Sequence, residues 1–463
     1  MTIDPAKHSL QEISDVLTNR NLSSVELTEY SISRKELDSY SNAYKYWCPE
    51  SGLMTAKEAD DAYDSGKMPS PLQGIPVSLK DIYGHPKFPI FAGSYRELPH
   101  KWRKPGPIVH SLMSQLSVFC GKTHTVEFAY GGLGVNSHWE TPRNPWCKDA
   151  HRVPGGSSSG AGISIHQGSA LVALGTDTAG SVRIPASCAG VVGLKTSHRL
   201  WSTRGIVPLS PLLDTAGVLT RTARDCAYAF HAISHPDESL SQHRARLDRT
   251  NHMQSENFRI GVADSGIMWD CQDDISEICM AAVHALEGDG CSIVPIEFPN
   301  AETAIEIRDK GGTTSVELIE FLGSELPQWL DNLDPVISER IKIGGDISAI
   351  EYLTRIRQIR QARIEVQNRF ENYDVIAAPT VPITPPLLDE ARSDEDYMPL
   401  NLLTLRNTGV GSYLDLCAIS IPVGLDRSNM PVGIQLMAPA GKEHLLLAIG
   451  QRLESIIPRP ALI

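Results

Sequence analysis

Apolar residues at helical spacing mark the start of the chain. In residues 9–37 they recur every three or four positions, a polar step at 19–21 interrupts them, and the pattern restarts at Ser23 with Glu26 behind it. A serine followed by a glutamate three positions later is typical of a helix start. The segment therefore predicts two helices.

Strict alternation of apolar and polar residues follows at 75–80. A strand places successive side chains on opposite faces, so the three aliphatic residues would share one face and Ser78 and Lys80 the other. The next residue, Asp81, would then point away from Lys80. We expect a strand that ends at this lysine.

Downstream, short apolar runs predict buried strands and longer amphipathic patterns predict helices, in the alternating order of an α/β protein. The polar segment 235–257 shows no clear period and predicts a surface loop or insert. The Arg residues of 354–369 predict a solvated helix face. Strands are expected at 170–175, 258–262, 291–296, 375–378, 418–421 and 433–436, and helices at 274–286, 347–372 and 443–455.

Composition narrows the class of protein. The chain has 463 residues, of which 41% are hydrophobic and 36 are glycine, as in soluble globular proteins. Lys and Arg number 42 against 55 Asp and Glu, which gives a formal net charge of −13. This balance disfavours a nucleic acid or an anionic membrane as partner.

The cysteines and the N-terminal segment indicate the compartment. The nine cysteines include no CxxC pair and no His/Cys cluster at zinc-site spacing, so we expect reduced thiols and no structural metal. Residues 1–13 lack the continuous apolar stretch of a signal peptide, and no run of about 18 apolar residues occurs. We expect a cytoplasmic protein.

Two short motifs suggest other functions but fail on their context. Gly121-Lys122-Thr123 resembles the end of a phosphate-binding loop, yet Leu116 stands where that motif needs a glycine. The segment 156–160 fits the GxSxG nucleophile elbow, which needs a strand running into the turn. Pro154 and Gly155 precede it and disfavour such a strand. Neither nucleotide binding nor an α/β-hydrolase is expected.

Two long blocks carry a far more specific signal. Residues 155–200 run GGSSSGAGISIHQGSALVALGTDTAGSVRIPASCAGVVGLKTSHRL, and residues 71–84 run PLQGIPVSLKDIYG. Both resemble the amidase signature family. TPRNP at 141–145 and IPVGLDRSNMPVGIQLMAP at 421–439 agree with it as well. The resemblance covers nearly the whole chain.

The resemblance implies a catalytic triad of serine, serine and lysine. Motif position makes Ser181 the nucleophile, Ser157 a bridging serine behind a cis peptide bond, and Lys80 the base. A lysine is a base only when neutral, and its usual pKa of about 10.4 corresponds to a gap of roughly 4.6 kcal/mol at pH 7. Burial lowers the pKa of a lysine, so we expect a dry pocket around Lys80.

The same resemblance assigns an oxyanion hole to backbone N–H groups of the nucleophile loop. Family members commonly carry Gly-Gly before the nucleophile, whereas the first of the two positions here is an alanine. Because an alanine disfavours positive φ, we expect a right-handed or extended conformation at that position. Asp177 and Arg183 flank the loop and are expected to pair and, with Ser158, to support it. The residues of the hole are Thr178, Ala179, Gly180 and Ser181.

For the fold, the resemblance implies one α/β domain over residues 1–463. It would be a three-layer α/β/α structure with a mixed sheet of about 10–11 strands, a width known in large enzymes. The core signature would span about 70–230 and a variable helical or loop insert about 235–350. No metal or organic cofactor is implied. Homodimers are frequent among relatives, which makes a homodimer one candidate, and the sequence leaves the oligomeric state open.

The function implied is a serine hydrolase of carbon–nitrogen bonds in small molecules, acting through an acyl-enzyme on Ser181. Amides, urea-like compounds, carbamates (urethanes) and aryl esters all remain open as substrates. One alternative is the glutamine-hydrolysing subunit of a tRNA-dependent amidotransferase, although the Met-Tyr-Leu stretch usual in that subunit is missing here. Another is a non-catalytic scaffold, which typically lacks the serine or lysine that this chain retains.

The substrate pocket is the least determined part of the site. In the family it is built from variable loops, which here would include 92–100, 130–138, 200–212 and parts of 300–350. Aromatic, glycine and leucine residues in these loops are candidates to line it, and ordinary packing explains the side chains among them equally well. They are Tyr95, Tyr130, Gly131, Gly132, Leu133, Trp201 and Leu209.

Overall fold

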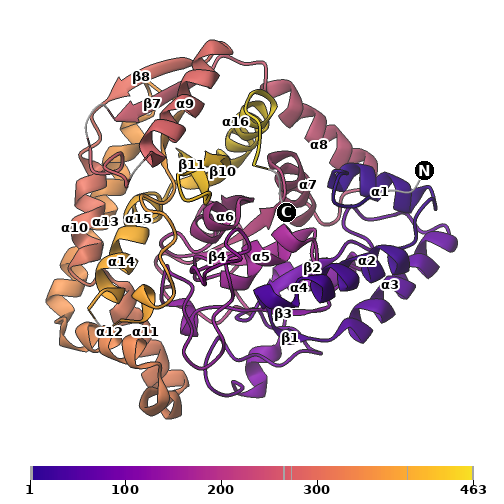
Figure 1. Cartoon of the computed structure of the whole chain (residues 1–463), viewed down its shortest axis with the longest axis horizontal. Coiled ribbons are helices and arrows are strands. Elements are labelled where there is room, and N and C mark those ends of the chain that lie inside the picture. Colours follow the sequence, from indigo (N-terminus) through magenta and orange to yellow (C-terminus); the bar gives the residue numbers. More distant parts are fainter. Residues whose placement is uncertain (1–3, 264–265, 273, 394, 461–463) are drawn as a thin grey trace.

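The computed structural model describes residues 4–263, 266–272, 274–393 and 395–460. In these ranges one mixed sheet contains eleven strands in the order β1-β3-β2-β4-β6-β5-β10-β11-β9-β7-β8. Figure 1 shows the sheet running from β1 at the bottom to β8 at the top. The predicted α/β class and width of the sheet are confirmed. The strands are β1 (Tyr44–Trp47), β2 (Val77–Lys80), β3 (Gly121–Thr123), β4 (Val172–Asp177), β5 (Val192–Lys195), β6 (Thr215–Thr220), β7 (Arg259–Ala263), β8 (Ser292–Ile296), β9 (Val375–Pro379), β10 (Cys417–Leu425) and β11 (Pro431–Ala438).

Helices cover both faces of this sheet. On one face α5 and α6 pack against each other and on the central strands, and on the other face α16 packs on β10 and β11 beside α7 and α9. The helices are α1 (Leu10–Thr18), α2 (Ser24–Leu37), α3 (Pro49–Asp64), α4 (Pro107–Ser114), α5 (Ser159–Gln167), α6 (Arg183–Ala189), α7 (Ala223–Ser234), α8 (Leu240–Met253), α9 (Ile275–Gly288), α10 (Asn300–Asp309), α11 (Thr314–Glu325), α12 (Pro335–Asp346), α13 (Ala349–Arg369), α14 (Tyr397–Thr404), α15 (Arg406–Tyr413) and α16 (Glu443–Ile456).

Strand β2 shows how the sequence pattern translates into packing. It lies parallel between β3 and β4. Val77 and Leu79 belong to the large apolar core, while the Ser78 hydroxyl lies 2.9 Å from the hydroxyl of Ser164 on α5. The predicted alternation is confirmed, and both faces of the strand are buried. A polar residue on the α5 face of this strand is therefore enclosed within the protein.

Helix starts follow capping chemistry, including one that the periodicity did not reveal. Ser9 and Ser23 each form a capping box, which confirms the two N-terminal helices. The prediction of a loop at 235–257 is wrong, because Ser239 and Gln242 form a third capping box and start α8. Polar residues fill most of this helix, and only a narrow stripe is buried, so no clear period was visible. The stripe consists of Leu240, His243, Leu247 and Thr250.

The basic residues of α13 are only partly solvated. Arg357 and Arg360 are exposed, as predicted. Arg355 is buried instead and donates to the Gly312 carbonyl at 2.8 Å, and Arg363 donates to the Tyr413 carbonyl at 2.9 Å. The prediction fails at these two positions because their guanidinium groups bond to carbonyls of neighbouring segments.

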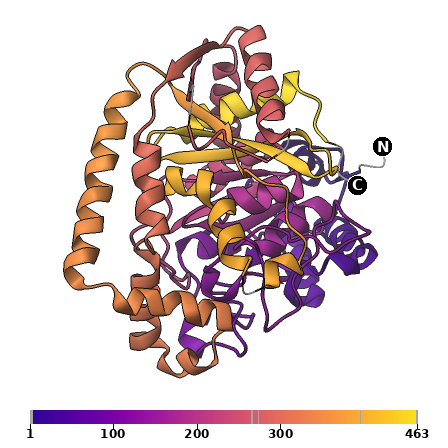
Figure 2. The same ribbon diagram turned by 60° about the vertical axis from the view of Figure 1, so that its left-hand side comes forward.

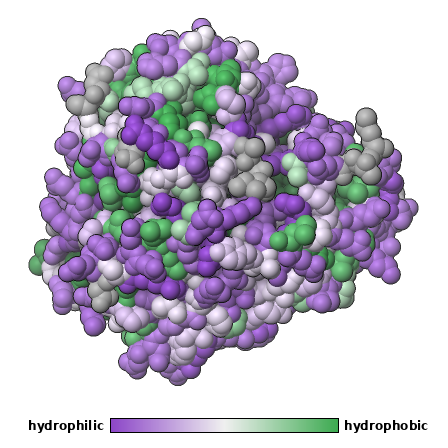
Figure 3. Space-filling model, viewed as in Figure 1, coloured by the Kyte–Doolittle hydropathy of each residue, from purple (hydrophilic) through white to green (hydrophobic). Residues whose placement is uncertain are grey.

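The segments after β8 build one side of the molecule. Figure 2 shows α10 to α13, in orange tones, as a group beside the sheet. Helix α10 packs on α13 and on α15, which brings residues near 308 against residues near 409. The face in Figure 3 is mostly hydrophilic, with scattered apolar patches.

Candidate active site

Lys80 ends strand β2 inside the protein. Its side chain is 0% exposed, and its Nζ donates to the Ser157 Oγ at 2.7 Å and to the Thr176 Oγ1 at 2.9 Å. The sequence analysis did not predict Thr176 as a partner of Lys80. Its position directly after the predicted strand 170–175 was the only sequence feature that could have indicated it. The structure thus joins two of the three predicted triad residues directly.

The environment of Lys80 changes its protonation. Burial lowers the pKa of the Lys80 amine from 10.5 to about 7, against the opposing effect of the Asp214 and Asp177 carboxylates. The charged form is disfavoured because a low-dielectric interior cannot replace its hydration. Near neutral pH a large share of the molecules therefore carries a neutral amine, which is able to accept a proton.

Two other buried lysines provide a comparison. The Lys122 Nζ donates to the Tyr83 carbonyl at 2.6 Å, and the Lys195 Nζ donates to the Leu416 carbonyl at 2.9 Å. Burial lowers the pKa of both amines as well. A carbonyl has no proton to pass on, whereas the hydroxyl partners of Lys80 do. Among these three lysines, Lys80 alone is placed for proton transfer to a hydroxyl.

The loop that carries Ser157 is fixed from both sides. The peptide bond between Gly156 and Ser157 is cis, as the resemblance implied. Gly156 donates its N–H to the Gly132 carbonyl at 2.6 Å, and Ser158 donates its N–H to the Ser181 carbonyl at 3.3 Å. The loop therefore contacts the backbone of the predicted nucleophile.

Asp177 organises the loop that carries Ser181. Its carboxylate accepts the N–H groups of Gly180 at 2.7 Å and Val182 at 3.2 Å. It also pairs with the fully buried guanidinium of Arg183 through two bonds of 3.0 Å, which confirms the predicted pairing. Burial by itself would raise the pKa of the Asp177 carboxyl, but the Arg183 charge and these hydrogen bonds keep it below its usual value.

This arrangement decides which N–H groups are free for an oxyanion. The N–H of Gly180 is already donated to Asp177, which corrects its predicted place in the oxyanion hole. In the hydrogen bonds of the described residues, the N–H groups of Thr178, Ala179 and Ser181 donate to no other group. Ala179 does not adopt positive φ, as expected, whereas Gly180 has a φ of 135°.

A cavity of about 360 Å³ opens beside Ser181. Thr178 and Ala179 of the same loop line it, together with Tyr130 and Leu209. This volume lies near the lower end of the range for ligand pockets, about 300–1,000 Å³. Ser181 is thus a buried hydroxyl next to a space large enough for a small molecule.

The comparison with protein families decides the identity. The family model described as Amidase matches residues 26–447. The chain belongs to the amidase family. It is a hydrolase of carbon–nitrogen bonds other than peptide bonds, as the sequence predicted.

Characterised amidase-family proteins match over nearly their whole length. A 2-amino-5-chloromuconic acid deaminase of Comamonas testosteroni is 43% identical over 456 residues, which cover 98% of this chain and 97% of that protein. A glutamyl-tRNA(Gln) amidotransferase subunit of Desulforudis audaxviator is 31% identical over 478 residues, covering 96% and 94%. The native peptide amidase from Stenotrophomonas maltophilia shares the fold, with a TM-score of 0.81 at 24% identity and 99% coverage of both chains.

The amidase cavity contains only some of the predicted pocket residues. Tyr130, Gly131 and Leu209 line it. The assignment of Tyr95, Gly132 and Trp201 to its wall is not supported in the described residues. The Tyr95 ring lies 6.5 Å from that of Trp329, the Trp201 Nε1 donates to the Ser234 hydroxyl, and Gly132 donates its N–H to Asn401. These residues pack the surrounding structure, as does Leu133, which belongs to a separate apolar cluster.

Other cavity residues were missed because they come from distant segments. Arg308 and Lys310 lie close together at the end of α10, and Arg340 comes from α12. Helices α14 and α15 and the residue between them supply Met398, Leu402, Leu405 and Tyr413. Only the general expectation for 300–350 pointed to this wall, and no local motif marked the individual side chains.

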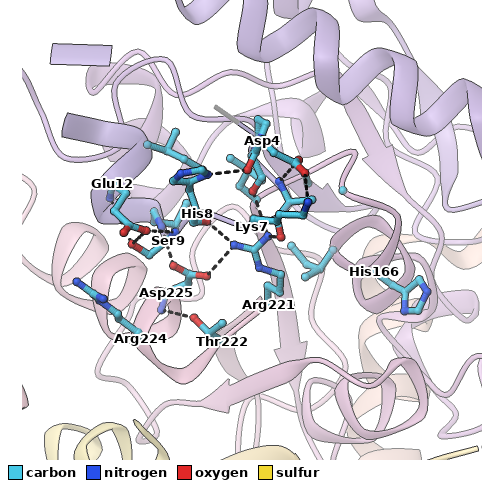
Figure 4. A pocket seen from close by; sticks show the side chains of 18 of the residues that line it. Asp4, Lys7, His8, Ser9, Glu12, His166, Arg221, Thr222, Arg224 and Asp225 are labelled. Carbon is cyan, nitrogen blue, oxygen red and sulfur yellow. Dashed lines mark hydrogen bonds and ion pairs between the residues drawn. The ribbon is translucent and has the colours of Figure 1, made fainter. Parts of the chain in front are cut away.

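A second cavity, of about 870 Å³, lies at the N-terminal segment and is separate from Ser181. Figure 4 shows its polar residues bonded to one another. The Asp225 carboxylate accepts the Leu10 N–H at 2.7 Å, and Arg221 donates to the carbonyls of Pro5, Ala6 and His8. These bonds attach the N-terminal segment to α7.

The described ranges contain neither a metal-binding cluster nor a membrane-spanning helix. There, no group of three or more His, Cys, Asp or Glu side chains is arranged to hold a metal ion. None of the helices within those ranges combines the length and the hydropathy that a membrane crossing needs.

Proposed function

We propose that this chain hydrolyses a carbon–nitrogen bond of a small organic molecule with Ser181 as nucleophile, Ser157 as proton relay and Lys80 as base. The observation that carries the proposal is the 2.7 Å contact between the Lys80 Nζ and the Ser157 Oγ in a buried site. A serine hydroxyl is a weak nucleophile until a base removes its proton. A buried amine with a pKa of about 7 is such a base at neutral pH.

The proton balance of the reaction follows from this order of residues. The Ser181 Oγ attacks the carbonyl carbon while its proton moves to Ser157, whose own proton moves to Lys80. The carbon–nitrogen bond then breaks, and the leaving amine takes a proton through Ser157 from Lys80. Water attacks the resulting ester by the same route, which releases the acid and restores the Ser181 hydroxyl.

The hydroxyls of Ser157 and Ser181 are not hydrogen-bonded to each other among the described contacts. Hydrogen bonds used in catalysis are often incomplete until substrate is bound. A rotation about χ1 of Ser181 moves its hydroxyl without moving the loop, which the Ser158–Ser181 backbone bond holds. The relay contact is therefore assigned to the substrate complex.

Negative charge on the tetrahedral intermediate needs donors next to Ser181. We assign this role to the N–H groups of Thr178, Ala179 and Ser181, since Gly180 donates to Asp177. Donors fixed before the reaction stabilise the developing charge at no cost of reorganisation. The Asp177–Arg183 pair holds their loop in place.

The names of the relatives support ammonia as one product. The Comamonas testosteroni protein at 43% identity is a deaminase of 2-amino-5-chloromuconic acid. We propose that this chain also releases ammonia, in its case from a small primary amide, because the acyl transfer described above needs a carbonyl carbon. The acyl transfer described above applies equally to amide, carbamate and aryl ester carbonyls. The nine cysteines are all free, which supports the cytoplasm as the location. A homodimer stays one candidate for the oligomeric state, which is open.

The test uses covalent labelling and turnover together. An uncharged fluorophosphonate should add its mass to Ser181, located by peptide mass spectrometry. Wild type and the Ser181→Ala variant are then assayed with p-nitroanilides, p-nitrophenyl esters, aryl carbamates and small primary amides, with ammonia and dye release as readouts. Labelling or turnover that persists in Ser181→Ala would reject Ser181 as the nucleophile.

One alternative has support from the comparisons. Several relatives near 30% identity are glutamyl-tRNA(Gln) amidotransferase subunits. That function predicts ammonia release from glutamine that depends on a partner chain and tRNA. The test assays the purified chain with glutamine, alone and together with the partner chain and tRNA. Glutamine turnover slower than that of the small amides under both conditions would exclude this function. The non-catalytic scaffold is disfavoured because Lys80, Ser157 and Ser181 are all present.

A further inference from the structure

The cavity beside Ser181 is cationic in a protein of net charge −13. Arg308, Lys310 and Arg340 line it, whereas Asp309 is the only acidic residue in its described wall. Lys310 is largely exposed and pairs with Glu306, so it lies at the mouth. The two arginines are the buried charges.

Arg340 carries a charge without an acidic partner. It is 7% exposed, and its Nη1 donates to the Tyr130 carbonyl. Its guanidinium carbon lies 3.8 Å from the centroid of the Tyr130 ring, in the stacked position that favours a cation. Among the described residues no carboxylate lies within ion-pair distance of Arg340. Its other described polar neighbour is the uncharged Tyr397 hydroxyl, so the guanidinium charge is not neutralised.

Arg308 has an unused donor as well. Its Nε and Nη2 both donate to the Asp309 Oδ1, and its side chain is 8% exposed. The Nη1 is buried and bonds to no described group. A buried guanidinium N–H without an acceptor is unfavourable, so Arg308 carries an unsatisfied donor within the wall of the cavity.

We propose that the substrate is a small organic acid and that Arg340 and Arg308 bind its carboxylate groups while its carbon–nitrogen bond lies at Ser181. The proposal rests on the proposed function and names its substrate class. Guanidinium forks match carboxylates in charge and geometry. A bound carboxylate gives Arg340 its missing counter-charge and places a second negative charge beside Arg308, which also lines the cavity.

The rest of the wall fits a short hydrocarbon. Met398, Leu402 and Leu405 of α14 and its C-cap line the cavity together with Ile343 of α12. A cavity of about 360 Å³ has room for a carbon chain between polar ends. Apolar walls with a few placed polar groups are the usual form of a small-molecule site.

The test measures protection of Ser181 from an uncharged fluorophosphonate. Adipate and adipamide have the same carbon chain, but only adipate is charged. In wild type, the adipate concentration that halves the labelling rate should be at least tenfold lower than the adipamide concentration that does so. Arg340→Gln and Arg308→Gln should each remove most of this preference, because one charge-assisted hydrogen bond corresponds to about 10- to 100-fold in affinity. Arg360→Gln, an exposed arginine on α13, is the matched control and should retain it.

The outcomes separate this inference from the proposed function. If wild type is not labelled at Ser181, the proposed function fails. If it is labelled but adipamide or inorganic phosphate protects as well as adipate, the carboxylate site is rejected. Should Arg340→Gln not fold, Arg340→Lys keeps the charge without the fork and should retain only part of the preference. An unchanged preference in both Arg340→Lys and Arg308→Gln would also overturn the inference.

Discussion

The Lys80 Nζ and the Ser157 Oγ lie 2.7 Å apart although 77 residues separate them in the chain. Strand β2 carries the lysine, and the loop before α5 carries the serine. Both are fully buried, so the contact couples an amine and a hydroxyl without competing water. The proposed chemistry depends on the neutral form of that amine.

Activity should therefore rise with pH. With a pKa of about 7 for Lys80, the fraction of molecules with a neutral amine increases as pH rises through 7 and decreases as pH falls below 7. We expect kcat/KM for a neutral amide to increase about tenfold per pH unit below 7 and to level off above pH 8. A profile without a transition between pH 5 and 9 would contradict a lysine base.

Stability should report the same titration. The folded pKa of Lys80 is about 7, and its ordinary value is 10.5, so the unfolded chain binds more protons between these two values. Wild type should therefore gain stability relative to Lys80→Met as pH rises from 7 to 9, by about 2 kcal/mol. Urea unfolding of both proteins at pH 6, 7, 8 and 9 measures this difference. A difference independent of pH would mean that the amine is not buried in its neutral form.

Loss of the Asp177 carboxylate should damage the site and the fold together. Asp177→Asn leaves the buried Arg183 guanidinium without its counter-charge. Breaking a buried ion pair in this way costs about 3–5 kcal/mol, measured by denaturant unfolding. We also expect kcat to fall, because the amide NH2 that replaces one carboxylate oxygen faces the N–H donors of the nucleophile loop and of Arg183. The control is Glu325→Gln, which breaks the exposed pair with Lys101 and should cost less than about 1 kcal/mol.

Two neighbouring substitutions should have opposite results. A Cβ at Gly180 would lie 2.1 Å from the Thr408 Oγ1, and its φ of 135° disfavours any side chain. Gly180→Ala should therefore displace the loop together with the neighbouring N–H groups assigned to the oxyanion hole. We expect kcat/KM to fall at least about 100-fold, the effect of losing one such donor. Ala179→Gly should stay within about threefold of wild type because Ala179 already has an ordinary φ. Steady-state kinetics of both variants measure these changes in kcat/KM. A fully active Gly180→Ala variant would contradict the assigned loop geometry.

Local pattern was sufficient for most of the secondary structure. The helices at α1 and α2 and the alternation of β2 follow from residues close in sequence. The prediction failed at α8, where a capping box starts a helix with only a narrow buried stripe. It also failed at Arg355 and Arg363, because their acceptors are carbonyls of other segments.

The sequence by itself determined the family, the sheet class and the positions of Lys80, Ser157 and Ser181, because the long signature blocks contain these residues. The tertiary structure alone decided how they are used. It buried the lysine, bonded Gly180 to Asp177, excluded Tyr95 and Trp201 from the cavity wall and brought Arg308 and Arg340 to it. The physical reason is that a cavity wall is assembled from segments hundreds of residues apart, and their meeting depends on packing across the sheet.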